Sequence, residues 1–300
     1  MAAEKHLHLA GIGVGHSIAP PMHNSIAKSL DLPWMFYSTE CPTLESVISL
    51  ARDEQTVGLV VTMPYKTSIL PHVDAIDEIA KTIGACNLVY RDPGKPQQLH
   101  ASNTDWLGVK GCLLEKSPKG RPVLSKPALI VGAGGASRAA LYALTVFFQS
   151  STIYVLNRDD AEVEALVNDA KRLPREIDII HVRPGQSQTL PTPYYIVGTV
   201  PDLEPRSSEE RSLKASLEEF LSRPEKGVLL DMCFKPRRTR TIKLAERLGW
   251  STVEGTHVIG YQIEEQWRHW AGDERSQHLD KQQARQTLLR SAESSPAING

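Results

Sequence analysis

The sequence predicts an α/β protein of two domains, one of them built on a doubly wound parallel sheet. Three observations predict this class. Strand-like apolar runs alternate with helix-like segments along most of the chain. A glycine-rich turn directly follows one such run, at residues 128–131. The chain has 300 residues, 41% hydrophobic and 23% charged, which suffices for two soluble domains of ordinary size.

The first hundred residues predict strands and helices in alternation. We expect strands over 6–12 and 57–61, and helices over 21–30, 43–51 and 73–82. Thr43 is suited to cap its helix, and Glu45 gives that helix an acidic first turn. The stretch 92–98, rich in Pro, Gly and Gln, predicts a turn between two short strands.

The remainder of the chain predicts the parallel sheet. Residues 116–126 contain two prolines, a glycine and several charges, which indicates a surface linker. Beyond this linker, strand signals recur at 128–131, 152–156, 177–182, 194–197 and 227–231, with helical segments between most of them. The segments 201–207 and 291–300 are polar, and we expect them to be mobile.

The glycine-rich turn predicts a binding site for a dinucleotide. Gly132 would form the tight turn, Gly134 would let the backbone approach a pyrophosphate, and Ser137 would allow close packing of helix on strand. The helix that follows, to about residue 149, would direct its first N–H groups and its dipole at the phosphates. The residues expected to hold the cofactor here are Gly132, Ala133, Gly134, Gly135, Ala136 and Ser137.

Composition and charge limit the remaining function classes. The net charge of −1 gives no electrostatic basis for binding nucleic acid or an anionic membrane. The first residues lack the apolar core of a signal peptide, and no run is apolar enough to span a membrane. We therefore expect a cytoplasmic protein with reduced cysteines. His16 and His23 have no third ligand at a supporting spacing, so we expect no metal.

Polar residues gather where other strand-like runs end. Ser17 follows the first predicted strand, and Thr62 and Lys66 follow the strand at 57–61. Asn87 and Asp105 lie in two further polar stretches and would converge on the same crevice, beyond the carboxyl ends of the strands. A lysine near a carboxylate there can have its protonation tuned for proton transfer. The alternative is a solvated Lys66 and an Asp105 that only caps the following helix.

These stretches resemble the shikimate dehydrogenase family, which includes the quinate/shikimate dehydrogenases. The resemblance covers most of the chain, and several ordered motifs are more specific than any one of them. The motifs are His-Ser-x-x-Pro (Ser17), Val-Thr-x-Pro-x-Lys (Thr62, Lys66), Gly-Ala-x-Asn (Asn87), Asn-Thr-Asp-x-x-Gly (Asp105), Gly-Ala-Gly-Gly-Ala-Ser-Arg (from Gly132), Asn157-Arg158, Asp231-Met232, and Gly255 followed by Tyr261-Gln262.

The resemblance implies a hydride exchange between a nicotinamide and a ring carbon that bears a hydroxyl or a ketone. Lys66 would carry the alcohol proton, and Asp105 would pair with Lys66 and bind a neighbouring hydroxyl. The residues that would bind the hydroxylated ring carboxylate are Ser17, Thr62, Asn87 and Gln262. The amides of Asn87 and Gln262 offer both donor and acceptor; the alternatives are a turn residue and a helix-surface residue.

The resemblance also implies a domain organisation. Residues 1–107, completed by the C-terminal helices 253–300, would form the substrate domain, and 108–252 would form a Rossmann-like domain that binds NAD or NADP. The active site would lie in the cleft between them. We expect a monomer or a homodimer.

Several departures from the family pattern leave the substrate and cofactor open. Ala19 replaces a hydroxyl residue that helps to hold the substrate carboxylate, and Phe234 replaces a tyrosine. Thr199 lies in Val-Gly-Thr, where Asn-Ala-Thr usually lies beside the nicotinamide. A related ring acid, or a metabolite sensor without activity, is therefore the alternative to shikimate or quinate.

The segment Asn157-Arg158-Asp159 bears on the choice of cofactor. Family members that use NADP resemble Asn-Arg-Thr here. Arg158 is retained and would suit a 2′-phosphate, whereas Asp159 would repel it. We expect weakened discrimination in favour of NADP and a usable NAD, with the preference between them open.

Overall fold

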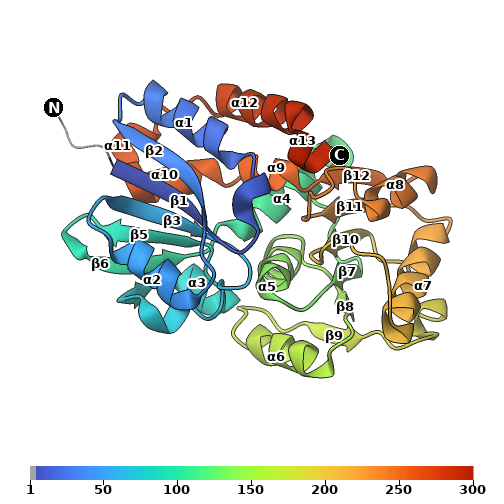
Figure 1. Ribbon diagram of the computed structural model, residues 1–300. Helices are drawn as coiled ribbons and strands as arrows, with labels where there is room; N and C mark the ends of the chain where they lie inside the picture. The colour runs from blue at the N-terminus through green and yellow to red at the C-terminus, as the bar shows by residue number, and fades with distance from the viewer. Residues whose placement is uncertain (1–4, 300) are drawn as a thin grey trace. The chain divides into compact units, whose positions relative to one another are not determined.

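The structure is a computed structural model that describes residues 5–299 (Figure 1). It divides into two compact units. Unit 1 contains the described residues up to Thr104 together with Ile259–Ile298, and unit 2 contains Asp105–Val258 with Asn299. From the sequence we expect boundaries near 107 and 252; the division falls after Thr104 and after Val258.

Unit 1 contains a mixed six-stranded sheet in the order β2-β1-β3-β5-β6-β4. β1 pairs in parallel with both β2 and β3, whereas β5 is antiparallel to its neighbours β3 and β6. The residues just before β5 therefore lie at the same sheet edge as the residues just after β1, β3 and β6. The strands are β1 (Lys5–Gly11), β2 (Trp34–Glu40), β3 (Thr56–Val61), β4 (Ala75–Ile76), β5 (Leu88–Asp92) and β6 (Lys95–Ser102).

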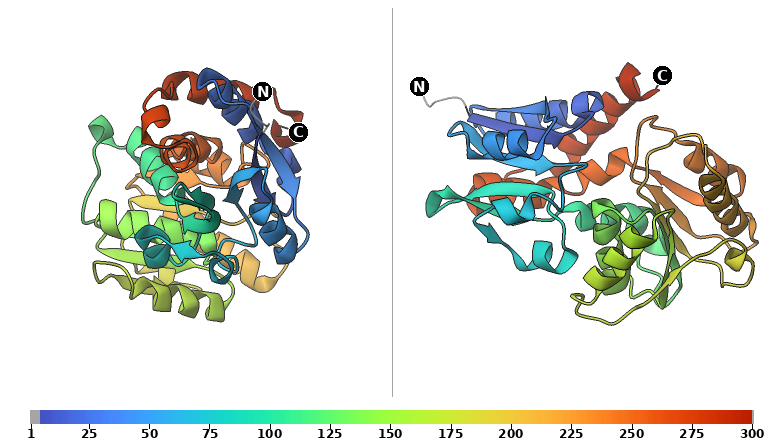
Figure 2. Two further views of the ribbon diagram at one scale, coloured as in Figure 1. Left: turned by 90° about the vertical axis from the view of Figure 1, so that its left-hand side faces the viewer. Right: turned by 60° about the horizontal axis from the view of Figure 1, so that its bottom comes forward.

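Helices from two distant parts of the sequence cover this sheet. The N-terminal part contributes α1 (Ala19–Ser29), α2 (Leu44–Arg52) and α3 (Glu78–Ile83), and the C-terminal part contributes α10 (Ile263–Ala271), α11 (Asp273–Ser276) and α12 (Lys281–Ser294). Figures 1 and 2 show α12, in red, lying along α1, in blue. At the start of α2, Thr43 and Ser46 form a reciprocal cap, as the sequence predicts for Thr43.

An aromatic cluster joins α10 to the N-terminal part of unit 1. The ring of His23 in α1 stacks on Phe36 of β2 at 4.2 Å between centroids, and the indole N–H of Trp267 donates to His23 Nδ1 at 3.1 Å. Trp270 packs against His23 at 5.7 Å. Burial lowers the pKa of His23 to about 3, so this imidazole stays neutral. His23 thus serves packing between helices.

Unit 2 contains a parallel six-stranded sheet in the order β12-β11-β10-β7-β8-β9. In chain order its strands read 3-2-1-4-5-6 across the sheet, which confirms the predicted doubly wound class. The strands are β7 (Ala128–Val131), β8 (Thr152–Leu156), β9 (Asp178–His181), β10 (Tyr195–Gly198), β11 (Val228–Asp231) and β12 (Ser251–Glu254).

The helices of unit 2 cover both faces of the sheet. They are α4 (Asp105–Lys116), α5 (Gly135–Tyr142), α6 (Asp160–Ala170), α7 (Ser208–Ser222), α8 (Arg240–Arg247) and the short α9 (Thr256–Gly260) at the unit boundary. α5 continues as one π-helical turn over Ala143–Phe147. On one side of the sheet, Leu129, Ile196 and Leu229 pack against Phe220 of α7.

Two sequence-based expectations are wrong in detail. The segment 73–82 is not one helix, because β4 precedes α3 and the Asp77 side chain caps α3 by accepting from Ala80 N at 2.7 Å. The tail expected to be mobile is helical: α12 runs to Ser294 and α13 covers Pro296–Asn299, anchored by the buried Ile298.

Some expectations concern residues outside the described range. Residues 1–4, which belong to the segment judged to lack a signal peptide, and Gly300 lie outside it. Within residues 5–299, no helix has the length and apolar character that a membrane crossing needs.

Candidate active site

One edge of the unit 1 sheet collects the polar residues that the sequence singled out. Val60, Leu88 and Ser102 lie in register across β3, β5 and β6. Thr62 follows Val60 by two residues, and Asn87 directly precedes Leu88. The backbone confirms this alignment, because Val61 N donates to Asn87 O at 2.9 Å and Asn87 N donates to Ser102 O at 3.1 Å.

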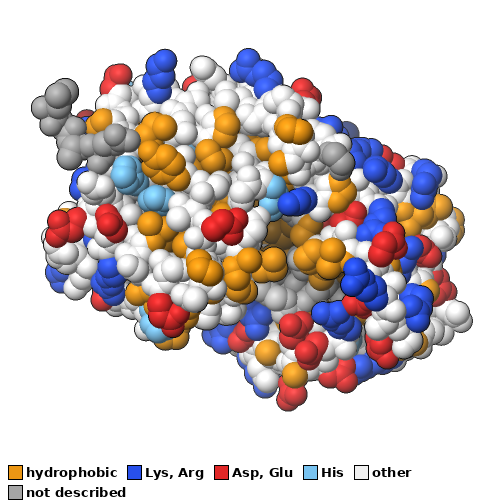
Figure 3. Space-filling view, in the orientation of Figure 1, with side chains coloured by type: hydrophobic (Ala, Val, Ile, Leu, Met, Phe, Trp, Pro, Cys, Tyr) orange, Lys and Arg blue, Asp and Glu red, His pale blue; other side chains and the backbone are white. Residues whose placement is uncertain are grey.

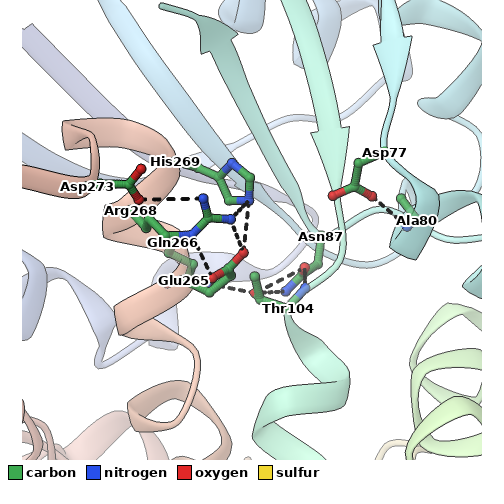
Figure 4. A network of polar contacts seen from close by, with 9 residues as sticks. All are labelled: Asp77, Ala80, Asn87, Thr104, Glu265, Gln266, Arg268, His269 and Asp273. Carbon is green, nitrogen blue, oxygen red and sulfur yellow. Dashed lines mark hydrogen bonds and ion pairs between the residues drawn. The ribbon is translucent and has the colours of Figure 1, made fainter. Parts of the chain in front are cut away.

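A buried network of amides and one hydroxyl lies at this edge, and Figure 4 draws its members Asn87, Thr104 and Gln266. Asn87 Nδ2 donates to Gln262 Oε1 at 2.7 Å and to Thr104 Oγ1 at 3.1 Å. The Thr104 hydroxyl donates to Gln262 Oε1 at 2.7 Å, and Thr104 N donates to Asn87 Oδ1 at 2.6 Å. Gln266 Nε2 lies 3.3 Å from both Thr104 Oγ1 and Gln262 Oε1. The network therefore fixes which way the amides point.

Burial distinguishes this network from a set of surface contacts. Asn87 is 1% exposed, Thr104 0%, Gln262 5% and Gln266 3%. Gln262 is thus no helix-surface residue: it occupies the N-cap position of α10 without a side-chain capping bond, and its side chain is directed into the network. Among the described residues, Gln266 Oε1 is a buried acceptor that has no hydrogen-bond partner. Thr104 and Gln266 were not predicted, although the four-residue spacing of Gln262 and Gln266 places both on one helix face.

Ion pairs within α10, and from α10 to Asp273 of α11, stabilise the helix that carries Gln266 (Figure 4). Glu265 pairs with Arg268 and with His269, and Arg268 also reaches Asp273 at 3.7 Å. Hydrogen bonds from Arg268 and His269 lower the pKa of Glu265 to about 2. His269 packs on the Tyr90 ring of β5 at 4.1 Å, which ties α10 to the sheet.

The other predicted substrate residues of unit 1 lie in loops after β1 and β3. Ser17 Oγ accepts from Ala19 N at 3.2 Å, where Ala19 is the first residue of α1. Thr62 packs so closely on Gly11 that a Cβ at Gly11 would lie 2.4 Å from its methyl group. The half-buried Lys66 accepts from Cys86 N at 2.7 Å with its carbonyl, which links its loop to the residue before Asn87.

Asp105 belongs to unit 2 as the first residue of α4, directly after Thr104 of the network. Its side chain is buried, with 4% exposed. A carboxylate in the first turn of a helix is favoured by the helix dipole, which is compatible with the predicted capping alternative as well as with a substrate role.

The glycine-rich turn of unit 2 has the conformation predicted for it. Gly132 adopts a φ of +114°, and a Cβ there would lie 2.4 Å from Thr199 Oγ1. Its N–H donates to Leu156 O of β8 at 2.8 Å. Thr199 Oγ1 donates to Val131 O at 2.8 Å and lies 2.8 Å from Ser137 Oγ, which is therefore the donor to it. The residues after β7 and β10 are thus joined at the switch point of the sheet.

The start of α5 is open in the way that an anion site requires. Gly134, the N-cap of α5, is exposed, has no side-chain capping bond, and a Cβ there would meet no atom within 4 Å. The turn is completed by Ala133, Gly135 and Ala136. The Arg138 side chain donates to Ala133 O at 2.9 Å, which stabilises the turn. The N–H groups of the first turn and the helix dipole suit a phosphate at this place.

The loop after β8 carries the residues predicted to bear on cofactor choice. Asn157 Nδ2 donates to Asp159 O at 3.1 Å and to Glu162 Oε2 at 2.9 Å. Asp159 Oδ1 caps α6 by accepting from Ala161 N at 2.9 Å and from Glu162 N at 3.1 Å. Arg158 forms an ion pair with Glu210. Asp159 therefore has a structural role as the N-cap of α6, which was not predicted from the sequence.

A buried carboxyl, that of Asp231, lies at the end of β11. No role was predicted for it from the sequence. Asp231 accepts from the Thr239 hydroxyl at 2.8 Å and from Cys233 N at 3.3 Å. Burial raises the pKa of Asp231 to about 6. Phe234 follows in the same loop.

Across residues 5–299, no group of three or more His, Cys, Asp or Glu side chains is arranged to hold a metal ion.

Comparison with known proteins gives one consistent set of relatives. A family model described as the shikimate dehydrogenase substrate binding domain matches residues 9–89. A quinate dehydrogenase of Emericella nidulans is 35% identical over 287 residues, which cover 88% of this chain and 87% of that protein.

Solved structures share the fold. A quinate dehydrogenase from Corynebacterium glutamicum in complex with NAD superposes with a TM-score of 0.75 at 23% identity, over 96% of this chain and 100% of that chain. A shikimate 5-dehydrogenase from Thermus thermophilus in complex with NADP(H) and shikimate has a TM-score of 0.74 at 24% identity, over 96% of this chain and 99% of that chain.

Proposed function

The chain belongs to the shikimate and quinate dehydrogenase family, and from this premise we propose that it oxidises and reduces a ring hydroxyl of shikimate or quinate with NAD or NADP. The products of oxidation would be 3-dehydroshikimate or 3-dehydroquinate. The observation that carries the substrate class is the buried network of Asn87, Thr104, Gln262 and Gln266.

This network suits a ligand with several hydroxyl groups. An amide that is already held on one side by buried partners presents its remaining donor or acceptor in a fixed direction, at no further entropic cost. Asn87 and Gln262 would bind vicinal hydroxyls in this way, and Thr62 would add a third polar group from the loop after β3. Ser17, at the start of α1, would bind the carboxylate of the ring acid with help from the helix N-terminus.

Lys66 would move the proton that accompanies the hydride. Oxidation of a hydroxyl to a ketone releases one proton from oxygen as the hydride leaves carbon, so a basic group must lie at that oxygen. Lys66 follows the same strand as Thr62 and is half-buried. Asp105 would pair with Lys66 and orient it.

The glycine-rich turn of unit 2 would hold the dinucleotide. Gly134 and the first turn of α5 fit a pyrophosphate because a Cβ at Gly134 would meet no atom within 4 Å, and Gly132 forms the tight turn that precedes them. Thr199, fixed by Val131 and Ser137 at the end of β10, would lie beside the nicotinamide. When bound, the nicotinamide ring supplies the acceptor or donor of the hydride.

One observation favours a second candidate, a related ring acid as substrate. Ala19 N donates to Ser17 Oγ, so this hydroxyl already accepts a hydrogen bond within its own loop. Ala19 also places a methyl group where the family pattern has a second hydroxyl. A hydrogen bond to a charged group contributes about 1.5–3 kcal/mol, and its loss would lower the affinity for a carboxylate at least tenfold.

The deciding experiment follows absorbance of the reduced nicotinamide with purified protein. Shikimate and quinate are each combined with NAD and with NADP, giving four reactions. We expect reduction of the nicotinamide in at least one of them, at a rate that falls at least about a hundredfold when Lys66 is replaced by Ala. Folded protein that binds a dinucleotide in calorimetry but reduces it with neither acid would refute the substrate assignment. Activity with another hydroxylated ring carboxylate would then support the second candidate.

A further inference from the structure

The guanidinium group of Arg158 has a partner, Glu210, that was not predicted from the sequence. Arg158 Nη1 forms an ion pair with Glu210 Oε1, although the two residues lie 52 positions apart. Arg158 follows β8, whereas Glu210 lies in the first turn of α7. The pair therefore connects the loop after the second strand of unit 2 with the helix that follows β10.

The Glu210 carboxylate is held in place by its own helix. Ser207 and Glu210 form a capping box, in which Ser207 Oγ accepts from Glu210 N at 3.2 Å. Glu210 Oε2 accepts from Arg206 N at 2.7 Å and from Ser207 N at 3.2 Å. These backbone donors, together with Arg158, lower the pKa of Glu210. One oxygen thus serves the helix and the other serves Arg158.

Arg158 lines a hollow in which the other charged lining residues are acidic. The hollow has a volume of about 530 Å³ and is lined by Arg158, Asp159, Asp160, Ala161, Ser207 and Glu209. Of its carboxylates, Asp160 pairs with Arg183 at 2.6 Å, and Asp159 caps α6. In Figure 3, acidic and basic side chains are interspersed over the region of α6 and α7 and form no continuous basic patch.

The position of this hollow relates it to the dinucleotide. It lies at the carboxyl end of β8, the strand whose last residue, Leu156, accepts from Gly132 N of the glycine-rich turn. In doubly wound folds, the adenosine ribose lies at the end of this second strand, and its 2′ position distinguishes NAD from NADP. The inference that follows rests on the proposed function.

We propose that Glu210 is a specificity-determining residue that neutralises Arg158 and thereby selects the dinucleotide with a free 2′-hydroxyl. A 2′-phosphate would have to take Arg158 from Glu210, and the displaced carboxylate would then lie beside the phosphate with only one guanidinium between them. A neutral ribose diol requires no such exchange. The chain therefore favours NAD, even though it retains an arginine at the place that suits NADP.

The test compares dissociation constants for NAD and NADP by calorimetry, in the absence of substrate. Glu210→Gln keeps the acceptor that a capping box needs but removes the charge. We expect it to tighten NADP binding roughly five- to tenfold relative to NAD binding. Glu209→Gln is the matched control, because Glu209 lines the hollow on the same helix without pairing with Arg158. Glu209→Gln should change the ratio of the NADP and NAD dissociation constants less than about twofold.

A double-mutant cycle assigns the effect to the pair. In an Arg158→Ala background, Glu210→Gln should change the ratio no more than Glu209→Gln does. The proposal is overturned if the wild-type protein binds NADP more tightly than NAD, or if the ratio shifts equally in the two glutamine variants. Failure of the wild-type protein to bind either dinucleotide would instead refute the proposed function, so the two failures are distinguishable.

Discussion

Replacing Thr104 by Val tests whether the buried network stabilises unit 1. The substitution keeps the shape of the side chain and removes its hydroxyl, which is 0% exposed and makes three hydrogen bonds, to Gln262 Oε1, Asn87 Nδ2 and Gln266 Nε2. At a net contribution of about 1 kcal/mol for each bond, Thr104→Val should lower the free energy of unfolding by about 3 kcal/mol. Urea denaturation followed by tryptophan fluorescence measures this, because Trp267 and Trp270 lie on the same helix as Gln266.

The matched control is Thr56→Val in the same unit. Thr56 is also buried, but within the described residues its hydroxyl has no hydrogen-bond partner. Removing an unsatisfied buried hydroxyl from a strand should leave the free energy of unfolding unchanged or raise it. If Thr104→Val lowers the free energy of unfolding no more than Thr56→Val does, the hydrogen bonds of the network do not stabilise the fold, which would refute this prediction.

Three further predictions concern the turn, the proton carrier and pH. Gly132→Ala places a Cβ in a backbone with φ of +114°, so it should weaken dinucleotide binding in calorimetry more than tenfold, with strain of about 1–3 kcal/mol; unchanged affinity would contradict the role of the turn. Lys66→Ala should lower kcat at least a hundredfold and leave the dissociation constant of the dinucleotide within about twofold. Because the folded pKa of His23 is about 3 and the unfolded value is 6.5, only the unfolded state gains this proton as the pH falls below 6.5. The free energy of unfolding should therefore drop by about 1.6 kcal/mol between pH 6.5 and 5. Urea denaturation of His23→Gln at the two pH values should lack this drop.

The central strands of unit 2, β7, β8, β10 and β11, could be predicted from sequence because they are buried on both faces, whereas the edge strand β12 was not predicted. Residues 128–131 and 152–156 are continuous apolar runs that end at glycine or asparagine, and the structure has strands with these same bounds. β2 (Trp34–Glu40) was not predicted, because it is an edge strand of unit 1 and its second half is Ser-Thr-Glu. The helical tail was missed because its order comes from burial of Ile298, a contact that no local pattern reveals.

In the candidate site too, contacts between residues far apart in the sequence could not be predicted. The residues after each strand could be predicted to share an edge, since strand direction alone decides this. The contact between Asn87 and Gln262 joins residues 175 positions apart, and only the packing of α10 on β5 creates it. The Ser207-x-x-Glu210 capping box could be read in the sequence, but nothing local indicates that Glu210 also pairs with Arg158.

The two-part construction of unit 1 has a consequence for its synthesis on the ribosome. The 154 residues of Asp105–Val258 separate its sheet from α10, which at roughly 5–20 residues per second amounts to roughly 8–30 s of translation. During this time the surface that Trp267 and Trp270 later cover is exposed on the nascent chain. Unit 2 can complete its sheet before that helix emerges. The part of the chain that is made first is thus the part that finishes folding last, and it is where a chaperone would be needed.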